Sequence, residues 1–229
     1  MRTMRWALAS AAALWILGLP QLSIVSAAEK SAPAMSPNEA LKQLMAGNRR
    51  FQTDQTTHPV LHSQKRGELV GGQSPFAVIL SCSDSRVPPE LIFDQGLGGL
   101  FVVRVAGNTV TRAGLESIDY AVSQLGTPLI MVLGHEGCGA VKGAVAQCGG
   151  ESTAKLPEIF ANICPAVDRA RKAGGSRLES TAIDLNVDEQ VKILEHSALF
   201  KKRVADGSLK VVGARYQLES GKVELLDGD

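Results

Sequence analysis

The hydrophobic residues in the middle of the chain fall into short continuous runs, which are typical of strands buried on both faces of a sheet. Such runs occupy residues 76–80, 100–103 (within the segment 98–108) and 129–133, and a further run lies at 209–214. Residues 113–125 instead place apolar residues on one helical face, and Gly126-Thr127-Pro128 ends that helix. Strands that alternate with helices predict a parallel sheet covered on both faces.

The two ends of the folded region carry different signals. Ser36 begins a helix, because Pro37 suits the first turn and Glu39 completes a capping box. This amphipathic helix runs to about Gln52 and packs either on its own sheet or on a neighbouring subunit. At the other end, residues 217–226 predict an edge hairpin with its turn at Ser220-Gly221.

Further helices are predicted at residues 139–147, 156–172 and 188–204. Residues 53–72 are polar and show no periodicity, so we expect His58 and His62 to be solvated loop residues without a metal role. The whole pattern predicts an α/β fold. Its central, mostly parallel β-sheet is flanked by helices, with an N-terminal helical arm and a C-terminal edge hairpin.

The first 28 residues predict a cleaved signal peptide. Arg2 and Arg5 form a basic start, residues 7–19 an apolar core, and Val25-Ser26-Ala27 a small-residue cleavage site. The alternative is a membrane anchor, but spanning a bilayer takes about 20 apolar residues, and a proline interrupts this run. We therefore expect an exported, periplasmic protein in which residues 29–229 form one domain and no other segment crosses a membrane.

Composition agrees with a single globular domain. The 229 residues are 45% apolar and 21% charged, and the formal net charge is +1. The first 28 residues contain two arginines and no acid, so their removal brings the mature chain near −1. The chain has no basic stripe of the kind that binds nucleic acid, and we expect no such partner.

Sulfur and nitrogen ligands follow two of the predicted strands where each strand ends. Cys82 comes after residues 76–80, and His135 and Cys138 follow residues 129–133. The carboxyl ends of parallel strands lie along one edge of a sheet, so we expect these side chains to converge. Two sulfurs and one nitrogen form a zinc set whose fourth position is open, as in catalytic sites. Structural zinc stays an alternative, but it needs a fourth ligand, for which Asp84 is the remaining candidate. Redox sites use a Cys-x-x-Cys spacing that is lacking here.

Asp84 and Arg86 suit an open site beside Cys82. An Asp–Arg pair can form two parallel hydrogen bonds, which would hold Asp84 ionised and oriented. Asp84 could then accept a hydrogen bond from a metal-bound water, whose pKa zinc lowers to about 7. The alternative is an ion pair that only braces the loop.

Cys148 and Cys164 are the remaining cysteines of the four in the chain. In an oxidising compartment they can form a disulfide. As free thiols, they can equally be small buried residues. The sequence leaves both alternatives open, because it does not provide the Cα separation that a disulfide requires.

Three segments together resemble the β-class carbonic anhydrases. They are Cys82-Ser83-Asp84-Ser85-Arg86-Val87-Pro88, Phe101-Val102-Val103-Arg104 with Gly107-Asn108, and His135-Glu136-Gly137-Cys138-Gly139. The resemblance extends over residues 36–226 and its motifs are highly specific. It implies zinc-dependent, reversible hydration of carbon dioxide to bicarbonate. Each subunit would hold one zinc through Cys82, His135 and Cys138, with Asp84 and Arg86 as the catalytic pair.

The resemblance also implies a substrate pocket between subunits. Gln73 matches a glutamine that hydrogen-bonds bicarbonate in plant-like members, and Phe101 and Tyr120 match pocket walls. In this family the pocket lies at a dimer interface. We therefore expect a homodimer or a dimer of dimers, in which some walls come from the partner subunit.

One position departs from some bacterial members, which have a tryptophan three residues before the first zinc cysteine as part of an inhibitory bicarbonate site. Ile79 stands at that position here. Arg104 matches an arginine of that site, but members without the site also have it. We therefore expect an open site, in which water rather than Asp84 is the fourth zinc ligand.

Two other functions are compatible with the same residues. The fold also supports zinc hydrolases of carbon dioxide analogues, namely carbon disulfide and carbonyl sulfide. A non-catalytic zinc-binding or bicarbonate-sensing protein is the second alternative. The Asp84–Arg86 pair argues against it, because a sensor does not need to activate water.

Overall fold

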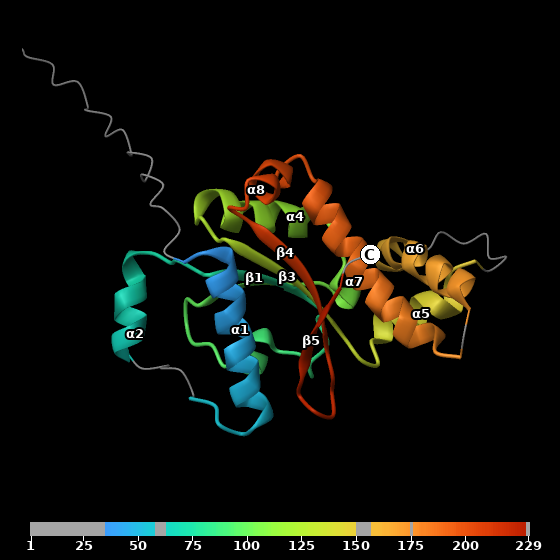
Figure 1. Cartoon of the computed structure of the whole chain (residues 1–229), viewed down its shortest axis with the longest axis horizontal. Helices are drawn as coiled ribbons and strands as arrows, with labels where there is room; N and C mark the ends of the chain where they lie inside the picture. The colour runs from blue at the N-terminus through green and yellow to red at the C-terminus, as the bar shows by residue number, and fades with distance from the viewer. Residues whose placement is uncertain (1–34, 58–62, 150–156, 175, 228–229) are drawn as a thin grey trace, which may run out of the picture.

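The computed structural model describes residues 35–57, 63–149, 157–174 and 176–227. The predicted signal peptide at residues 1–28, His58 and His62 lie outside these ranges. Within them the chain forms a five-stranded sheet of order β2-β1-β3-β4-β5 (Figure 1). The strands are β1 (Ala77–Ser81), β2 (Leu100–Arg104), β3 (Leu129–His135), β4 (Lys210–Tyr216) and β5 (Val223–Leu226). The first four pair in parallel and β5 pairs antiparallel with β4, which confirms the mostly parallel sheet and the C-terminal hairpin.

Helices cover both faces of the sheet. They are α1 (Pro37–Gln52), α2 (Ser63–Glu68), α3 (Pro89–Ile92), α4 (Arg112–Asp119), α5 (Gly139–Gln147), α6 (Glu158–Ala173), α7 (Leu178–His196) and α8 (Lys201–Ala205). Figure 1 shows α1 across the front of the sheet and α5 and α6 grouped at one end. In the part of the chain that the structure describes, no helix is long and apolar enough to span a membrane.

Alternate residues of the central strands face two separate hydrophobic layers, as the period of two in a strand requires. One layer joins α1, α5 and α6 to the sheet and includes Leu44, Ala77, Ile79, Leu129, Met131 and Ile163. The other joins α4, α7 and α8 to the opposite face and includes Val78, Leu80, Ile118, Ile130, Val187 and Phe200. Because both faces are covered, every residue of β1 and β3 is buried, and the strands read as continuous apolar runs.

The N-terminal helix packs on its own sheet. Ser36 and Glu39 form the expected capping box, and Ala40 and Leu44 are fully buried. Asn48 on the same face donates hydrogen bonds to the carbonyl oxygens of Ile92 and Gly221 at 3.2 and 2.8 Å. These bonds tie α1 to the end of α3 and to the turn between β4 and β5, so the helix packs on its own subunit.

One helix prediction is wrong in its bounds, and another helix differs in its regularity. The helix expected at residues 188–204 begins ten residues earlier, and Ser197, with ψ 136°, separates α7 from α8. The first half of α7 buries polar Asn186 together with Ala182, which interrupts the hydrophobic pattern. The helix expected at 113–125 is regular only to Asp119 and then widens into a π-type turn, Tyr120–Gln124. Helix α2 was not predicted, because it buries none of its residues and so has no apolar periodicity.

Cys148 and Cys164 form a disulfide, with their Cα atoms 5.5 Å apart. The disulfide joins the end of α5 to α6. Of the two alternatives that the sequence leaves open, the structure therefore shows the disulfide, while Cys82 and Cys138 are free thiols.

Candidate metal centre

Cys82, His135 and Cys138 come together at the carboxyl ends of β1 and β3. Ser81 lies opposite Leu133 in the parallel pair, so Cys82 and His135 leave the sheet side by side. Gly137, at φ 60°, then turns the chain so that Cys138 begins α5. The two sulfurs and one ring nitrogen of His135 lie within 4.8 Å of one another, and all three residues are buried. The convergence expected from parallel strand ends is thus present in one subunit.

The donor atoms of this cluster fit a zinc ion. Nδ1 of His135 lies 2.8 Å from the carbonyl oxygen of Glu136. A carbonyl can only accept, so Nδ1 carries the proton and Nε2 presents its lone pair. Among the described residues, that buried Nε2 has no hydrogen-bond partner. A buried nitrogen lone pair next to two free thiols is a donor set that tetrahedral zinc satisfies.

The two sulfurs influence each other's protonation. Hydrogen bonding from the Cys138 thiol, with further help from the backbone N–H of Gly107, lowers the pKa of Cys82 to about 4, although burial opposes it. The same contact, together with burial, raises the pKa of Cys138. The contact therefore favours a thiolate at Cys82, and a zinc ion held by both sulfurs would release the remaining proton of the pair.

Arg86 holds Asp84 beside the cluster. Its Nε donates to Oδ1 at 2.9 Å, its Nη2 to Oδ2 at 2.7 Å, and its backbone N–H to Oδ1 at 3.0 Å. The hydrogen bonds from the Arg86 side chain hold the pKa of Asp84 well below its usual range, although partial burial opposes them. Oδ2 lies 4.0 Å from Nε2 of His135. An ionised, oriented acceptor thus lies next to the donor atoms and is bound to arginine.

The loop that carries Asp84 is held by Arg104 and Gly107, whose contacts cannot be predicted from the hydrophobic pattern. Arg104, at the end of β2, donates to the carbonyl oxygens of Cys82 and Asp84 at 3.0 and 2.6 Å. The N–H of Gly107 donates to the Cys82 sulfur at 3.3 Å. The contact of Gly107 with the sulfur depends on the pairing of β1 with β2, which brings the ends of these two strands together.

The expected substrate residues are divided within one subunit. The rings of Phe101 and Tyr120 lie together, with centroids 6.3 Å apart, and Tyr120 is half exposed. Gln73 precedes β1, whereas Cys82 follows it, and a strand of this length spans about 17 Å. One subunit therefore places Gln73 at the opposite end of β1 from the metal ligands.

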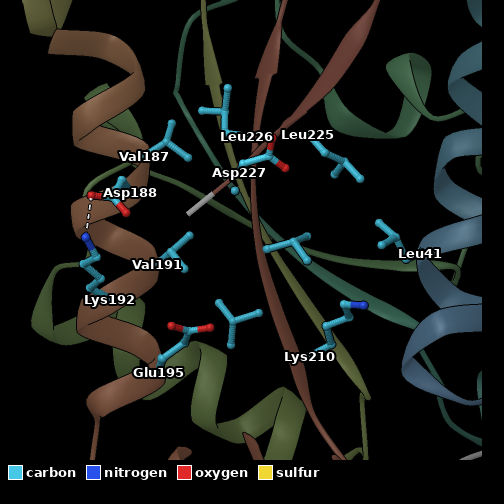
Figure 2. A pocket seen from close by; sticks show the side chains of 13 residues that line it. Leu41, Val187, Asp188, Val191, Lys192, Glu195, Lys210, Leu225, Leu226 and Asp227 are labelled. Carbon is cyan, nitrogen blue, oxygen red and sulfur yellow. Dashed lines mark hydrogen bonds and ion pairs between the residues drawn. The ribbon is translucent and has the colours of Figure 1, made fainter. Parts of the chain in front are cut away.

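A groove of about 470 Å³ lies elsewhere, between α7 and strands β4 and β5. Figure 2 shows Val187 and Val191 of α7 facing Leu226 across this groove, with Leu41 of α1 on the far side. On the rim of the groove, Lys192 donates to Asp188 at 2.9 Å. The groove contains none of the metal ligands and is no part of the candidate site.

The fold and the site define an α/β protein with a buried Cys-His-Cys metal centre and an adjacent Asp–Arg pair. Residues 77–223 match the carbonic anhydrase family. The chain is 43% identical over 198 residues to carbonic anhydrase 2 of Mycobacterium tuberculosis, covering 85% of this chain and 95% of the relative. It is 34% identical to a carbonic anhydrase of Pseudomonas aeruginosa, over 82% and 88% of the two chains.

Solved structures agree with this assignment. The β-carbonic anhydrase CcaA superimposes with a TM-score of 0.63 at 28% identity, over 82% of this chain and 95% of the other. The Coccomyxa β-carbonic anhydrase in complex with acetazolamide gives a TM-score of 0.63 at 26% identity, over 81% and 86%. The chain belongs to the β-class carbonic anhydrases, zinc enzymes that hydrate carbon dioxide reversibly.

Proposed function

We propose that Cys82, His135 and Cys138 hold the zinc and that Asp84, oriented by Arg86, accepts a hydrogen bond from the reacting water. One observation carries this assignment. Both oxygens of Asp84 are bound by Arg86, while Oδ2 lies 4.0 Å from the unpartnered Nε2 of His135. Zinc at such a site acts as a Lewis acid and lowers the pKa of a water molecule to about 7.

The protein's own groups orient the reaction. Asp84 is ionised, so it can only accept, and it fixes the direction of the O–H bond of the attacking oxygen. A lone pair of that oxygen then points at the carbon of carbon dioxide, and a C–O bond forms to give bicarbonate. The proton removed from water leaves to buffer. Arg86 keeps the carboxylate from turning, which lowers the entropic cost of this alignment.

The arrangement of Asp84 supports an open resting site. Arg86 also donates to the carbonyl oxygen of Gly137 at 3.3 Å, so it is tied to the loop that carries Cys138. Asp84 would have to leave Arg86 before it could become a metal ligand. We therefore propose that solvent is the fourth ligand near neutral pH.

The position of Gln73 supports a dimer. It cannot reach the metal ligands of its own subunit, so the partner subunit's Gln73 would complete the pocket. The outer edge of β2 has no partner strand among the described residues. Beside it lies a groove of about 480 Å³ that includes exposed Leu91 and Leu97. We propose a homodimer or a dimer of dimers that covers this region.

Export is proposed from the first 28 residues and is supported by the disulfide. The bond between Cys148 and Cys164 is of a kind that persists in oxidising compartments such as the periplasm. Detection of a mature chain that starts near residue 28 in a periplasmic extract tests this proposal. Retention of the full-length chain in the membrane fraction contradicts it.

Stopped-flow measurement of carbon dioxide hydration tests the activity on the zinc-loaded mature protein. We expect turnover that depends on zinc and is lost after chelation. Carbon disulfide and carbonyl sulfide, offered under the same conditions, separate hydration from hydrolysis of the sulfur analogues. Zinc binding without turnover of any of these substrates would instead indicate a sensor.

A further inference from the structure

Two buried amides project from α7 toward the loop that follows β2. Asn186 is 1% exposed and Gln190 is 0% exposed. They lie one helical turn apart, so their side chains are neighbours on the same face. Burying an amide is unfavourable unless its polar atoms are hydrogen-bonded. The partners of these side chains therefore indicate what they do.

The two amides hold both ends of the turn at residues 107–110. Asn186 Nδ2 donates to the carbonyl oxygen of Gly107 at 2.8 Å, and Gln190 Oε1 accepts the N–H of Val110 at 2.8 Å. Gln190 Nε2 also donates to Asn186 Oδ1 at 3.3 Å. These three bonds fix both orientations, because flipping either amide would set donor against donor or acceptor against acceptor.

The turn that they hold contacts a metal ligand. Gly107 donates its N–H to the Cys82 sulfur at 3.3 Å. Gly107 and Asn108 adopt positive φ values of 71° and 46°, which asparagine keeps only where its surroundings hold it. A Cβ at Gly107 would approach Ile163 to 2.6 Å, so the turn has no room to move toward α6.

Helix α7 is itself fixed against the strand that ends in His135. A Cβ added at Gly134 would lie 2.5 Å from Val187, and one at Gly213 would lie 2.7 Å from the same side chain. Val187 therefore packs directly on the backbone of β3 and β4. Since Asn186 precedes Val187, its amide is placed by the same close contact that sets the helix on the sheet.

We propose that Asn186, oriented by Gln190, is a positioning residue that keeps the Gly107 N–H on the Cys82 sulfur. A hydrogen bond to a thiolate stabilises its charge, and it also holds the sulfur in the orientation that binds a metal. The amide pair thereby sets the strength of one zinc–sulfur bond from a position that touches neither metal nor substrate. This inference rests on the proposed role of Cys82 as a zinc ligand.

The test compares two variants with a matched control in the cobalt(II)-substituted mature protein. Asn186→Leu removes the amide at similar volume, and Gln190→Met removes only its orienting partner. Asn48→Leu is the control, because Asn48 is also 0% exposed and donates two backbone-directed hydrogen bonds, but to Ile92 and Gly221. The measured signals are the near-ultraviolet thiolate-to-cobalt charge-transfer band of the cobalt form and, in separate zinc-loaded samples, the rate of zinc release to a chelator.

We expect the band of Asn186→Leu to move to longer wavelength and its zinc release to accelerate about 10-fold, the lower end of the effect of residues that support metal ligands. Gln190→Met should shift the band and accelerate zinc release in the same direction, but by smaller amounts than Asn186→Leu. If Asn186→Leu does not fold, the result for Gln190→Met decides the test. Asn48→Leu should lose stability and keep the band. If both α7 variants kept the wild-type band position and the wild-type rate of zinc release, the role inferred for Asn186 would be wrong, while the assignment of the zinc ligands would stand. No charge-transfer band in the wild-type cobalt protein would overturn the ligand assignment as well.

Discussion

Arg86 binds both carboxylate oxygens of Asp84, through Nε at 2.9 Å and Nη2 at 2.7 Å. The same carboxylate lies 4.0 Å from the metal-facing nitrogen of His135. Asp84 is thus close to the metal donors, while its oxygens are directed to arginine. This relationship supports the proposed role of Asp84 in orienting water, because a carboxylate bound at both oxygens is a poor competitor for a metal position.

Replacing Asp84 with asparagine should leave zinc bound and reduce turnover by about 10–100-fold, the usual effect of losing a group that supports a metal site. The amide keeps the shape of the side chain but not the negative charge that Arg86 orients. Stopped-flow kinetics measures the turnover, and metal analysis measures the zinc.

Asp94→Asn is a matched control for that variant. Asp94 is a buried carboxylate that also pairs with an arginine, Arg50, but at the start of a different loop. We expect this control to lose stability and to keep the wild-type turnover per folded molecule. Loss of zinc in Asp84→Asn would show that Asp84 is itself a metal ligand.

Cys82→Ser should abolish both zinc retention and activity. A hydroxyl is a poor replacement for a thiolate in a zinc site, and Cys82 is the more acidic sulfur of the pair. Equilibrium dialysis followed by metal analysis checks the occupancy. Stoichiometric zinc together with full turnover in this variant would show that the ligand assignment is wrong.

Removing the disulfide should destabilise the protein. The cross-link between Cys148 and Cys164 closes a loop with a sequence separation of 16 residues. The chain-entropy account gives about 3 kcal/mol for a loop of this size. The double variant Cys148→Ser with Cys164→Ser should therefore unfold at lower urea concentration than the oxidised protein. Identical urea midpoints for the two would show that the cross-link adds nothing.

A large part of the fold can be predicted from patterns among residues that are close in sequence. Strands β1 and β3 are continuous apolar runs because both faces are covered, and Cys82 and His135 directly follow or end them. Parallel pairing then brings these residues together, so two strand ends were sufficient to predict the metal set. The capping box at Ser36 likewise predicted where α1 begins.

Other features depend on contacts between distant parts of the chain. Asn186 is a polar residue inside a helix, and the helical pattern predicts that such a residue faces solvent. In the structure it is buried and donates a hydrogen bond to Gly107. Arg104 reads as the polar end of a strand, and only the pairing of β2 with β1 places it on the Cys82 loop. The resemblance predicts Gln73 as a substrate residue, but its place before β1 puts it at the opposite end of that strand from the metal ligands of its own subunit.

The last prediction concerns the state of the metal site near neutral pH. In some relatives, the aspartate that matches Asp84 binds the metal directly. Bicarbonate stabilises that closed state through a site that includes a tryptophan at the position of Ile79. Here Ile79 is fully buried in the hydrophobic layer between the sheet and α1. An aliphatic side chain has no N–H to donate, and this one has no surface on which a bicarbonate could bind.

We therefore expect a solvent molecule on zinc in crystals grown near neutral pH, with Asp84 still paired to Arg86. Bicarbonate should inhibit only as a product or competitive ligand, because no second site links its binding to the movement of Asp84. Its inhibition curve should then be hyperbolic. A sigmoidal curve, or a crystal structure in which an Asp84 oxygen binds zinc directly, would contradict this prediction. The buried position of Ile79 favours the hyperbolic result, since building a bicarbonate site there would require opening the core.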